Sequence, residues 1–152
     1  MPDILARDIM TRKVVTLQAE QPVIEAAKTL SQDRISGAPV LDEDGKVIGM
    51  VEEGDLIIQD VRLHFPTYVH FLDSYIYLGS LSKFESTLKK AVGARVKDIM
   101  TTEVPYTTPD ASIQDVATLM MQKDIHLVPV VQDDKLVGVI SRGDIVKSLG
   151  RD

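Results

Sequence analysis

The 152-residue chain contains one sequence pattern twice, about 90 positions apart. The run DIMT occupies residues 8–11 and again residues 98–101. Farther along, APVLDEDGKVIGMVEEGDL at 38–56 matches VPVVQDDKLVGVISRGDI at 128–145, where the offset falls to 89 because the second turn has one residue fewer. A duplication on this scale predicts two copies of one supersecondary unit that pack face to face. A single copy has too few apolar residues to cover a sheet and two helices.

Each copy is expected to form an amphipathic helix in its first half. Apolar residues recur at positions i, i+3, i+4 and i+7, which are Val23, Ala26, Ala27 and Leu30 in the first copy and Ile113, Val116, Ala117 and Met120 in the second. This spacing puts all four residues on one face of a helix and predicts a single buried stripe. Acidic residues near both helix starts suit the positive end of the helix dipole.

Two strands and a second helix follow in each copy. The strands are expected over 38–41 and 46–51, and over 128–131 and 135–140, because polar residues that favour tight reversals separate the apolar runs. With a strand ahead of the first helix, the unit is strand, helix, strand, strand, helix. We therefore expect an α/β (α+β) fold in which two β-α-β-β-α repeats pack about a pseudo-twofold axis.

An insert of different composition separates the two repeats. The repeats are expected over residues 6–59 and 95–150, and the insert over 60–94 holds six of the seven aromatic residues. Ser82 and Glu85 are spaced as a helix capping box ahead of an apolar stripe, so we expect a helical insert with an apolar face. Two roles remain open for this face: burial against the core or across a homodimer, and docking of a different protein.

Composition excludes several classes of partner. With 17 basic and 23 acidic side chains the net charge is −6, which opposes the phosphate backbone of nucleic acid, and no dense Lys/Arg cluster offsets it. No uninterrupted apolar segment is long enough to span a bilayer, and the first residues lack the pattern of a secretory signal. The chain has no cysteine, which suits a reducing compartment. We therefore expect a cytoplasmic protein with no nucleic-acid or membrane partner.

The doubled order of motifs carries a family resemblance. A DIMT run at the start, an xPVV strand and a G-h-h-S-x-x-D ending, where h is apolar, together resemble the CBS domain. Two in tandem resemble a CBS pair, or Bateman module, of the bacterial and archaeal stand-alone type, over about residues 6–149 without the insert. The resemblance implies a disc that commonly dimerises and binds AMP, ADP, ATP or S-adenosylmethionine between its repeats. It implies regulation, with no catalytic cofactor and no chemistry of its own.

The ending of the second copy has groups suited to an adenosine ligand. The two oxygens of the Asp144 carboxylate can accept both hydroxyls of a ribose. Ser141 and Arg142, at the start of the last helix, offer a hydroxyl and a positive charge to a phosphate beside the helix dipole. The structural alternative is that Ser141 and Asp144 only cap their helix.

The resemblance implies that the other repeat supplies the adenine pocket. The positions that match the family motif are Thr16, Ile35, Ser36, Gly37, Ala38 and Pro39. Apolar side chains there can sandwich a flat base while backbone groups reach its polar edge. The structural alternative is the buried start of a strand with a small-residue turn.

The second, pseudo-symmetric cleft departs from the motif. Glu52 stands where Ser141 stands in the other copy, so a carboxylate replaces the hydroxyl and would repel a phosphate. Asp55 remains available for a ribose. We therefore predict one good nucleotide site, built on Asp144, and an Asp55 cleft that is empty, weak or adapted to an uncharged or cationic adenosyl group.

The histidines indicate no metal site. His126 lies three residues before Pro129, where the resemblance to CBS proteins implies a possible contact to ligand phosphates, and the alternative is a partly buried histidine ahead of a strand. His64 and His70 are six positions apart, which does not place them on one helical face, and no third metal ligand is obvious.

Three classes of function follow from these observations. The first is a sensor that binds an adenosine-containing ligand and transmits its occupancy through a homodimer to a regulated protein. The second is a ligand-free dimerisation scaffold, which Glu52 favours and Ser141 with Asp144 oppose. The third, an enzyme, is the least supported, because the sequence has no cysteine, no phosphate-binding glycine loop and no recognisable catalytic triad.

Overall fold

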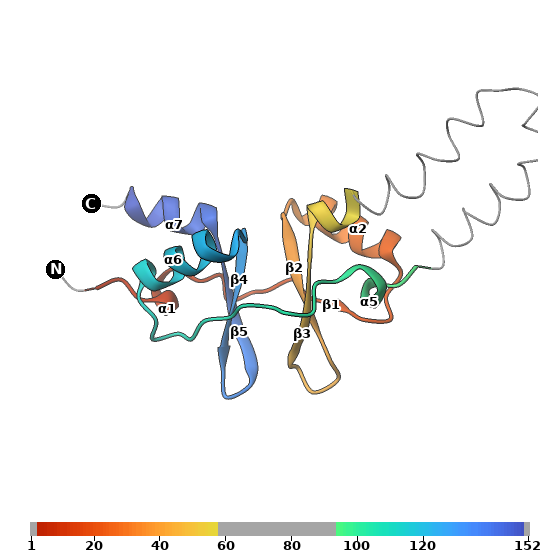
Figure 1. Ribbon diagram of the computed structural model, residues 1–152, viewed down its shortest axis with the longest axis horizontal. Coiled ribbons are helices and arrows are strands. Elements are labelled where there is room, and N and C mark those ends of the chain that lie inside the picture. The colour runs from red at the N-terminus through yellow and green to blue at the C-terminus, as the bar shows by residue number, and fades with distance from the viewer. Residues whose placement is uncertain (1–2, 58–93, 151–152) are drawn as a thin grey trace, which may run out of the picture.

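The computed structural model describes residues 3–57 and 94–150, which form two α+β repeats placed side by side (Figure 1). The aromatic-rich insert expected over 60–94 lies outside the described residues, apart from Ala94. Within the described ranges, no helix combines the length and apolar character needed to cross a bilayer.

The first repeat builds a three-stranded sheet. Its elements are α1 (Ala6–Ile9), β1 (Leu17–Gln18), α2 (Val23–Asp33), β2 (Gly37–Leu41) and β3 (Val47–Glu52). A further helix begins at residues 53–57. Strand β2 lies in the middle, parallel to β1 and antiparallel to β3.

The second repeat follows the same plan. Its elements are α5 (Val96–Ile99), α6 (Ile113–Lys123), β4 (Leu127–Gln132), β5 (Lys135–Ser141) and α7 (Arg142–Leu149). Strands β4 and β5 form an antiparallel hairpin, and a single parallel bridge from Thr107 to Val130 stands where β1 lies in the first repeat. The predicted order of elements is confirmed, and all four hairpin strands lie within one residue of their predicted bounds.

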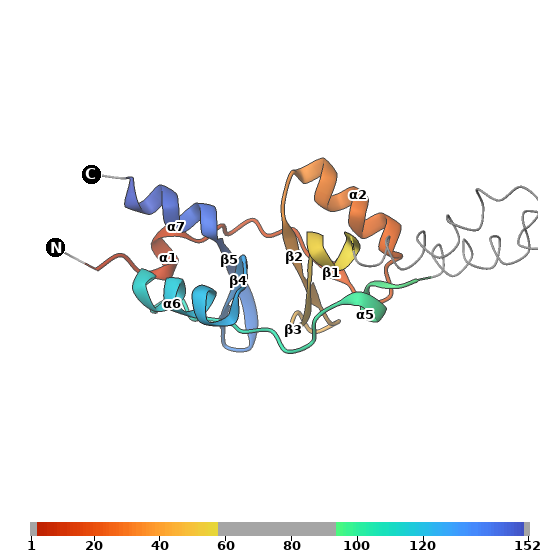
Figure 2. The ribbon, with the colours of Figure 1, turned by 45° about the horizontal axis from the view of Figure 1, so that its top comes forward.

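The predicted helical stripes form the sides of two separate cores. Val23, Ala26 and Leu30 of α2 are buried, as are Ile113, Val116 and Met120 of α6. The two hairpins meet in the middle of the molecule, where β2 contacts β4, and the helices lie to the outside (Figures 1 and 2). The region between the repeats is therefore bounded by strand residues from both copies.

The sequence pattern does not predict the short helices α1 and α5, and each packs on the opposite repeat. Helix α1 contacts α7 and β5, whereas α5 contacts β1 and β3, as both views show (Figures 1 and 2). The Met10 side chain lies where a Cβ on Gly138 would be, since that atom would stand 2.6 Å from its sulfur. At Gly49 the corresponding distance to the sulfur of Met100 is 2.5 Å. Each glycine therefore leaves the space in which a methionine from the other repeat packs.

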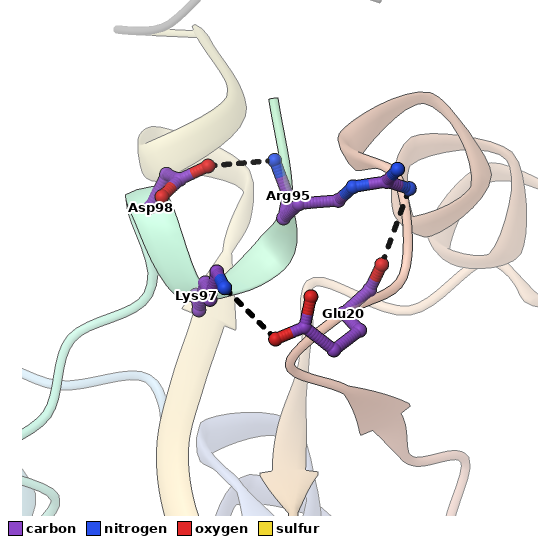
Figure 3. Close-up of polar contacts among 4 residues, drawn as sticks. All are labelled: Glu20, Arg95, Lys97 and Asp98. Carbon is purple, nitrogen blue, oxygen red and sulfur yellow. Dashed lines mark hydrogen bonds and ion pairs between the residues drawn. The ribbon is translucent and has the colours of Figure 1, made fainter. Parts of the chain in front are cut away.

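Polar contacts hold α1 and α5 in equivalent places. Lys97 of α5 donates a hydrogen bond of 2.8 Å to the Glu20 carboxylate, and the Arg95 guanidinium donates to the Glu20 carbonyl at 3.3 Å (Figure 3). The bond and the charge of Glu20 raise the pKa of Lys97 above its ordinary value of 10.5. Arg7 pairs with Asp110 at the matching positions on the other side. The duplication thus extends to the contacts between the repeats.

Candidate functional site

A cavity of about 320 Å³ lies between the repeats. Three regions form its walls: the segment after α1, the turn before β2, and the strands and α7 start of the second repeat. The lining residues are Thr11, Lys13, Val14, Val15, Arg34, Ile35, Ser36, Gly37, Pro39, Leu127, Val139, Ser141 and Asp144. This volume is at the lower end of the roughly 300–1,000 Å³ typical of small-molecule sites.

Ser141 and Asp144 both cap α7 and line the cavity. The Asp144 carboxylate accepts a 2.8 Å hydrogen bond from the Ser141 backbone N–H, and the Ser141 hydroxyl oxygen accepts one of 3.1 Å from the Asp144 N–H. The capping role of Ser141 and Asp144 is therefore present in the fold. It uses one oxygen of the carboxylate and an acceptor site of the hydroxyl, so a second carboxylate oxygen and the hydroxyl proton remain for a ligand.

The predicted adenine-binding residues divide between the cavity and the core. Ile35, Ser36, Gly37 and Pro39 line the cavity. Ala38, between them on β2, is fully buried in the first core, because successive side chains of a strand point to opposite faces. At Gly37 a Cβ would lie 2.9 Å from the Val51 carbonyl oxygen, so the close approach of β3 requires glycine there.

The segment after α1 contributes a wall that sequence reasoning missed. Val14 and Val15 line the cavity, whereas the predicted Thr16 is exposed and does not line it. Backbone bonds between Thr11 and Val139, 2.8 and 3.0 Å long, tie this segment to β5. Residues of the first repeat therefore meet Asp144 because α1 is docked on the second repeat.

The structure places Arg142 and His126 beside this cavity, in a second one of about 490 Å³. Its lining comprises Ser36, Glu52, Glu53, Gly54, Ile57, His126, Ser141, Arg142 and Gly143. Arg142 is held by its Nε–H, which donates to the Ile125 carbonyl at 3.0 Å, and by a 3.5 Å contact to Asp124. Ser36 and Ser141 line both cavities, so the two adjoin.

Asp55 has the same capping geometry as Asp144. Its carboxylate accepts a 2.8 Å hydrogen bond from the Glu52 backbone N–H. It lines neither of the two cavities, but Glu52 faces the larger one. Within residues 3–57 and 94–150, no cluster of three or more His, Asp or Glu residues is arranged to hold a metal ion. His64 and His70 lie outside those ranges.

Comparison with known sequences identifies the repeats. The model of the CBS domain matches residues 6–61 and 96–151. An uncharacterized protein of Methanocaldococcus jannaschii, MJ1426, is 32% identical over 153 residues, which span 95% of this chain and 90% of MJ1426. The chloroplastic CBS domain-containing protein CBSX1 of Arabidopsis thaliana is 30% identical over 93% of this chain, which spans 62% of CBSX1.

Solved structures share the fold. The CBS domain pair of protein MJ0100, in complex with 5′-methylthioadenosine and S-adenosyl-L-methionine, has a TM-score of 0.73 at 25% identity and covers 98% of both chains. CBSX2 of Arabidopsis thaliana, in complex with AMP, has a TM-score of 0.72 at 23% identity and covers 95% of both chains. The chain therefore belongs to the CBS domain family and carries two CBS repeats.

Proposed function

We propose that this CBS pair is a regulatory module that binds an adenosine-containing ligand in the 320 Å³ cavity between its repeats. The observation that carries the proposal is convergence: six of the nine residues predicted to bind the nucleotide line that one cavity. They are Ile35, Ser36, Gly37, Pro39, Ser141 and Asp144. The binding of two adenosyl ligands by the MJ0100 pair supports this choice of ligand class.

The chemistry of the walls suits the parts of an adenosine. Val14, Val15, Ile35 and Pro39 offer apolar surface for the base, as small-molecule sites require. The remaining oxygen of Asp144 can accept a ribose hydroxyl in a charge-assisted hydrogen bond.

A ligand in this cavity would contact both repeats. The first repeat supplies the segment after α1 and the turn before β2, and the second supplies β4, β5 and the start of α7. Binding can change the angle between the repeats only if the ligand has different affinities for the two arrangements. Contacts to both repeats supply such a difference, because a change of angle alters one set of contacts relative to the other.

The remaining parts of the proposal concern the setting of the module. We propose a homodimer that conveys occupancy to a regulated protein, a cytoplasmic location, and no catalysis. We also propose the division into repeats at 6–59 and 95–150 with the insert at 60–94. AMP, ADP, ATP and S-adenosylmethionine are all included in the ligand class.

Asp144→Asn with Asp55→Asn as its matched control tests the site. Both replacements remove a carboxylate that accepts a 2.8 Å capping bond, but only Asp144 lines the cavity. The measurement is a thermal-shift series with AMP, ADP, ATP, S-adenosylmethionine and GTP on protein that has been unfolded and refolded to remove carried-over ligand.

We expect at least one adenosyl ligand, at about 100 times its Kd, to add about 2.7 kcal/mol, or about 5 to 10 °C, to the stability of the wild type. Asp55→Asn should keep this response and Asp144→Asn should lose most of it. No response to any adenosyl ligand would favour the ligand-free scaffold instead. An equal loss of the thermal shift in both variants would show that the ligand does not bind specifically at Asp144.

A further inference from the structure

We propose that Lys13 and Arg34 make this cavity selective for a phosphorylated adenosine ligand over the cationic S-adenosylmethionine. The inference rests on the proposed function, because it names the ligand class of the same site. The two residues line the cavity from different walls, Lys13 from the segment after α1 and Arg34 from the turn before β2. Asp144 is the single acidic residue in that lining, so the walls carry a net positive charge.

Neither cation is neutralised within the described part of the chain. The ion pairs there join Arg7 to Asp110, Lys97 to Glu20 and Arg142 to Asp124. Lys13 and Arg34 form no such pair with a described carboxylate. Their charges therefore remain for an anionic ligand, because Lys and Arg side chains form strong, charge-assisted hydrogen bonds with anions.

Several donors at the start of α7 are already engaged. The backbone N–H of Arg142 donates to the His126 carbonyl at 3.2 Å, and that of Asp144 donates to the Ser141 hydroxyl. The Arg142 side chain is bound to the end of α6. Two of the first three amides of α7 are thus occupied, and Lys13 and Arg34 are the cationic residues that line the cavity.

The backbone of Arg34 adds an independent observation. It is the C-cap residue directly after α2 and has φ of 54°, in the left-handed region where Gly, Asn and Asp are favoured. Asp124 occupies the equivalent position of α6 with φ of 51°. An arginine therefore stands at a position whose backbone does not favour it, and this exposed residue is among those that line the cavity.

The pseudo-symmetric positions have the opposite charge. Ninety residues after Lys13 stands Glu103, and ninety after Arg34 stands Asp124. The position of Ser141 is taken by Glu52 in the other repeat. Three groups around the Asp144 site that accommodate an anion are thus replaced by carboxylates, which repel one. The duplicated backbone therefore carries one arrangement suited to phosphate and one opposed to it.

Charge reversal at the two cations tests the selection. Lys13→Glu and Arg34→Asp install the residues of the pseudo-symmetric positions, and Asp124 shows that aspartate suits the left-handed backbone. Arg12→Glu is the matched control, because it reverses a charge next to Lys13 at a residue that does not line the cavity. Calorimetric titrations of the full, refolded chain use AMP, neutral 5′-methylthioadenosine and S-adenosylmethionine.

We expect the wild type to bind AMP at least about tenfold more tightly than 5′-methylthioadenosine or S-adenosylmethionine, since hydrogen bonds to charged groups are among the strongest. Lys13→Glu and Arg34→Asp should each lower the affinity for AMP about tenfold or more, and leave that for 5′-methylthioadenosine within about twofold. Arg12→Glu should change neither. Added salt should weaken AMP binding to the wild type more than to the variants.

The two proposals fail in different ways. Suppose that 5′-methylthioadenosine or S-adenosylmethionine binds at least as tightly as AMP, and that this binding requires Asp144. The charge selection is then refuted, while the proposed adenosine site stands. Unchanged AMP affinity in both cavity variants refutes it as well. If none of the three ligands binds and the thermal-shift series shows no response to ADP or ATP either, the proposed function is wrong and the selection is refuted with it.

Discussion

Replacing Gly138 with alanine tests the docking of α1 on the second repeat. The new Cβ would lie 2.6 Å from the sulfur of Met10, 2.9 Å from its Cγ and 3.1 Å from its Cβ. A flexible side chain can move its sulfur, but the contact with the Met10 Cβ also requires a shift of the backbone that ends α1. Met10 is 9% exposed and packs in the second core, so it has little room to retreat.

We expect Gly138→Ala to lower the free energy of unfolding by about 1 to 3 kcal/mol, the usual cost of overpacking a core. For a chain of this length each kcal/mol corresponds to about 2 to 4 °C in the melting temperature. Gly49→Ala should cost a similar amount, because its Cβ would stand 2.5 Å from the Met100 sulfur. Gly54→Ala is the control, since no atom lies within 4 Å of its added Cβ.

The assay is urea unfolding of Gly138→Ala, Met10→Ala and the double variant. Met10→Ala alone should cost about 2 to 5 kcal/mol through the cavity that it leaves. In the double variant the added Cβ enters that space, so the combined loss should be smaller than the sum by about 1 to 3 kcal/mol. Additive losses, or a Gly138→Ala variant as stable as Gly54→Ala, would show that α1 does not pack on this strand.

Two further predictions concern the cap of α7 and the ion pair of α5. Ser141→Ala and Ser112→Ala each remove a hydroxyl that accepts a 3.1 Å capping bond, so each should lower the free energy of unfolding by about 0.5 to 2 kcal/mol in urea. Ser141 also lines the cavity, so only its replacement should weaken AMP binding, and equal AMP affinities would contradict this role. Glu20→Gln should lower the raised pKa of Lys97 in an NMR titration. Because the pKa of Lys97 is higher in the folded state, the pair stabilises the fold below about pH 10.5 and loses this contribution as the pH rises through the folded pKa. A pKa of Lys97 that Glu20→Gln leaves unchanged would refute the pairing.

The strands and long helices could be predicted because their signals are local. Apolar runs bounded by turn residues define β2 to β5 within one residue, and the stripe from Val23 to Leu30 matches the buried face of α2. Helices α1 and α5 have four residues each, which is too short for a 3.6-residue period to be visible. Their place in the fold is set by contacts with the opposite repeat, which no local pattern records.

The packing of α1 on the second repeat also explains which part of the candidate site could be predicted. Ser141 and Asp144 are a helix cap, and Ile35 to Pro39 begin a strand, so local motifs indicate both walls. Lys13, Val14 and Val15 reach the cavity only because α1 crosses to the second repeat. Arg34 carried one signal in the sequence: it lies at the end of a predicted helix, opposite an aspartate in the other copy.

In this duplicated chain the packing contacts are equivalent in the two repeats, whereas the charges that face the cavities are not. The bonds from Ala6 to Ala111 and from Val96 to Gln21, at 2.7 and 2.9 Å, occupy equivalent places, and so do the methionine and glycine contacts. Packing therefore requires the symmetry, because each leading helix completes the other repeat's core. A charge facing a cavity is under no such requirement, since its replacement leaves both cores intact. For this reason the reversals at Lys13 and Arg34, rather than the shared motif, are where a difference between the two ligand clefts should be sought.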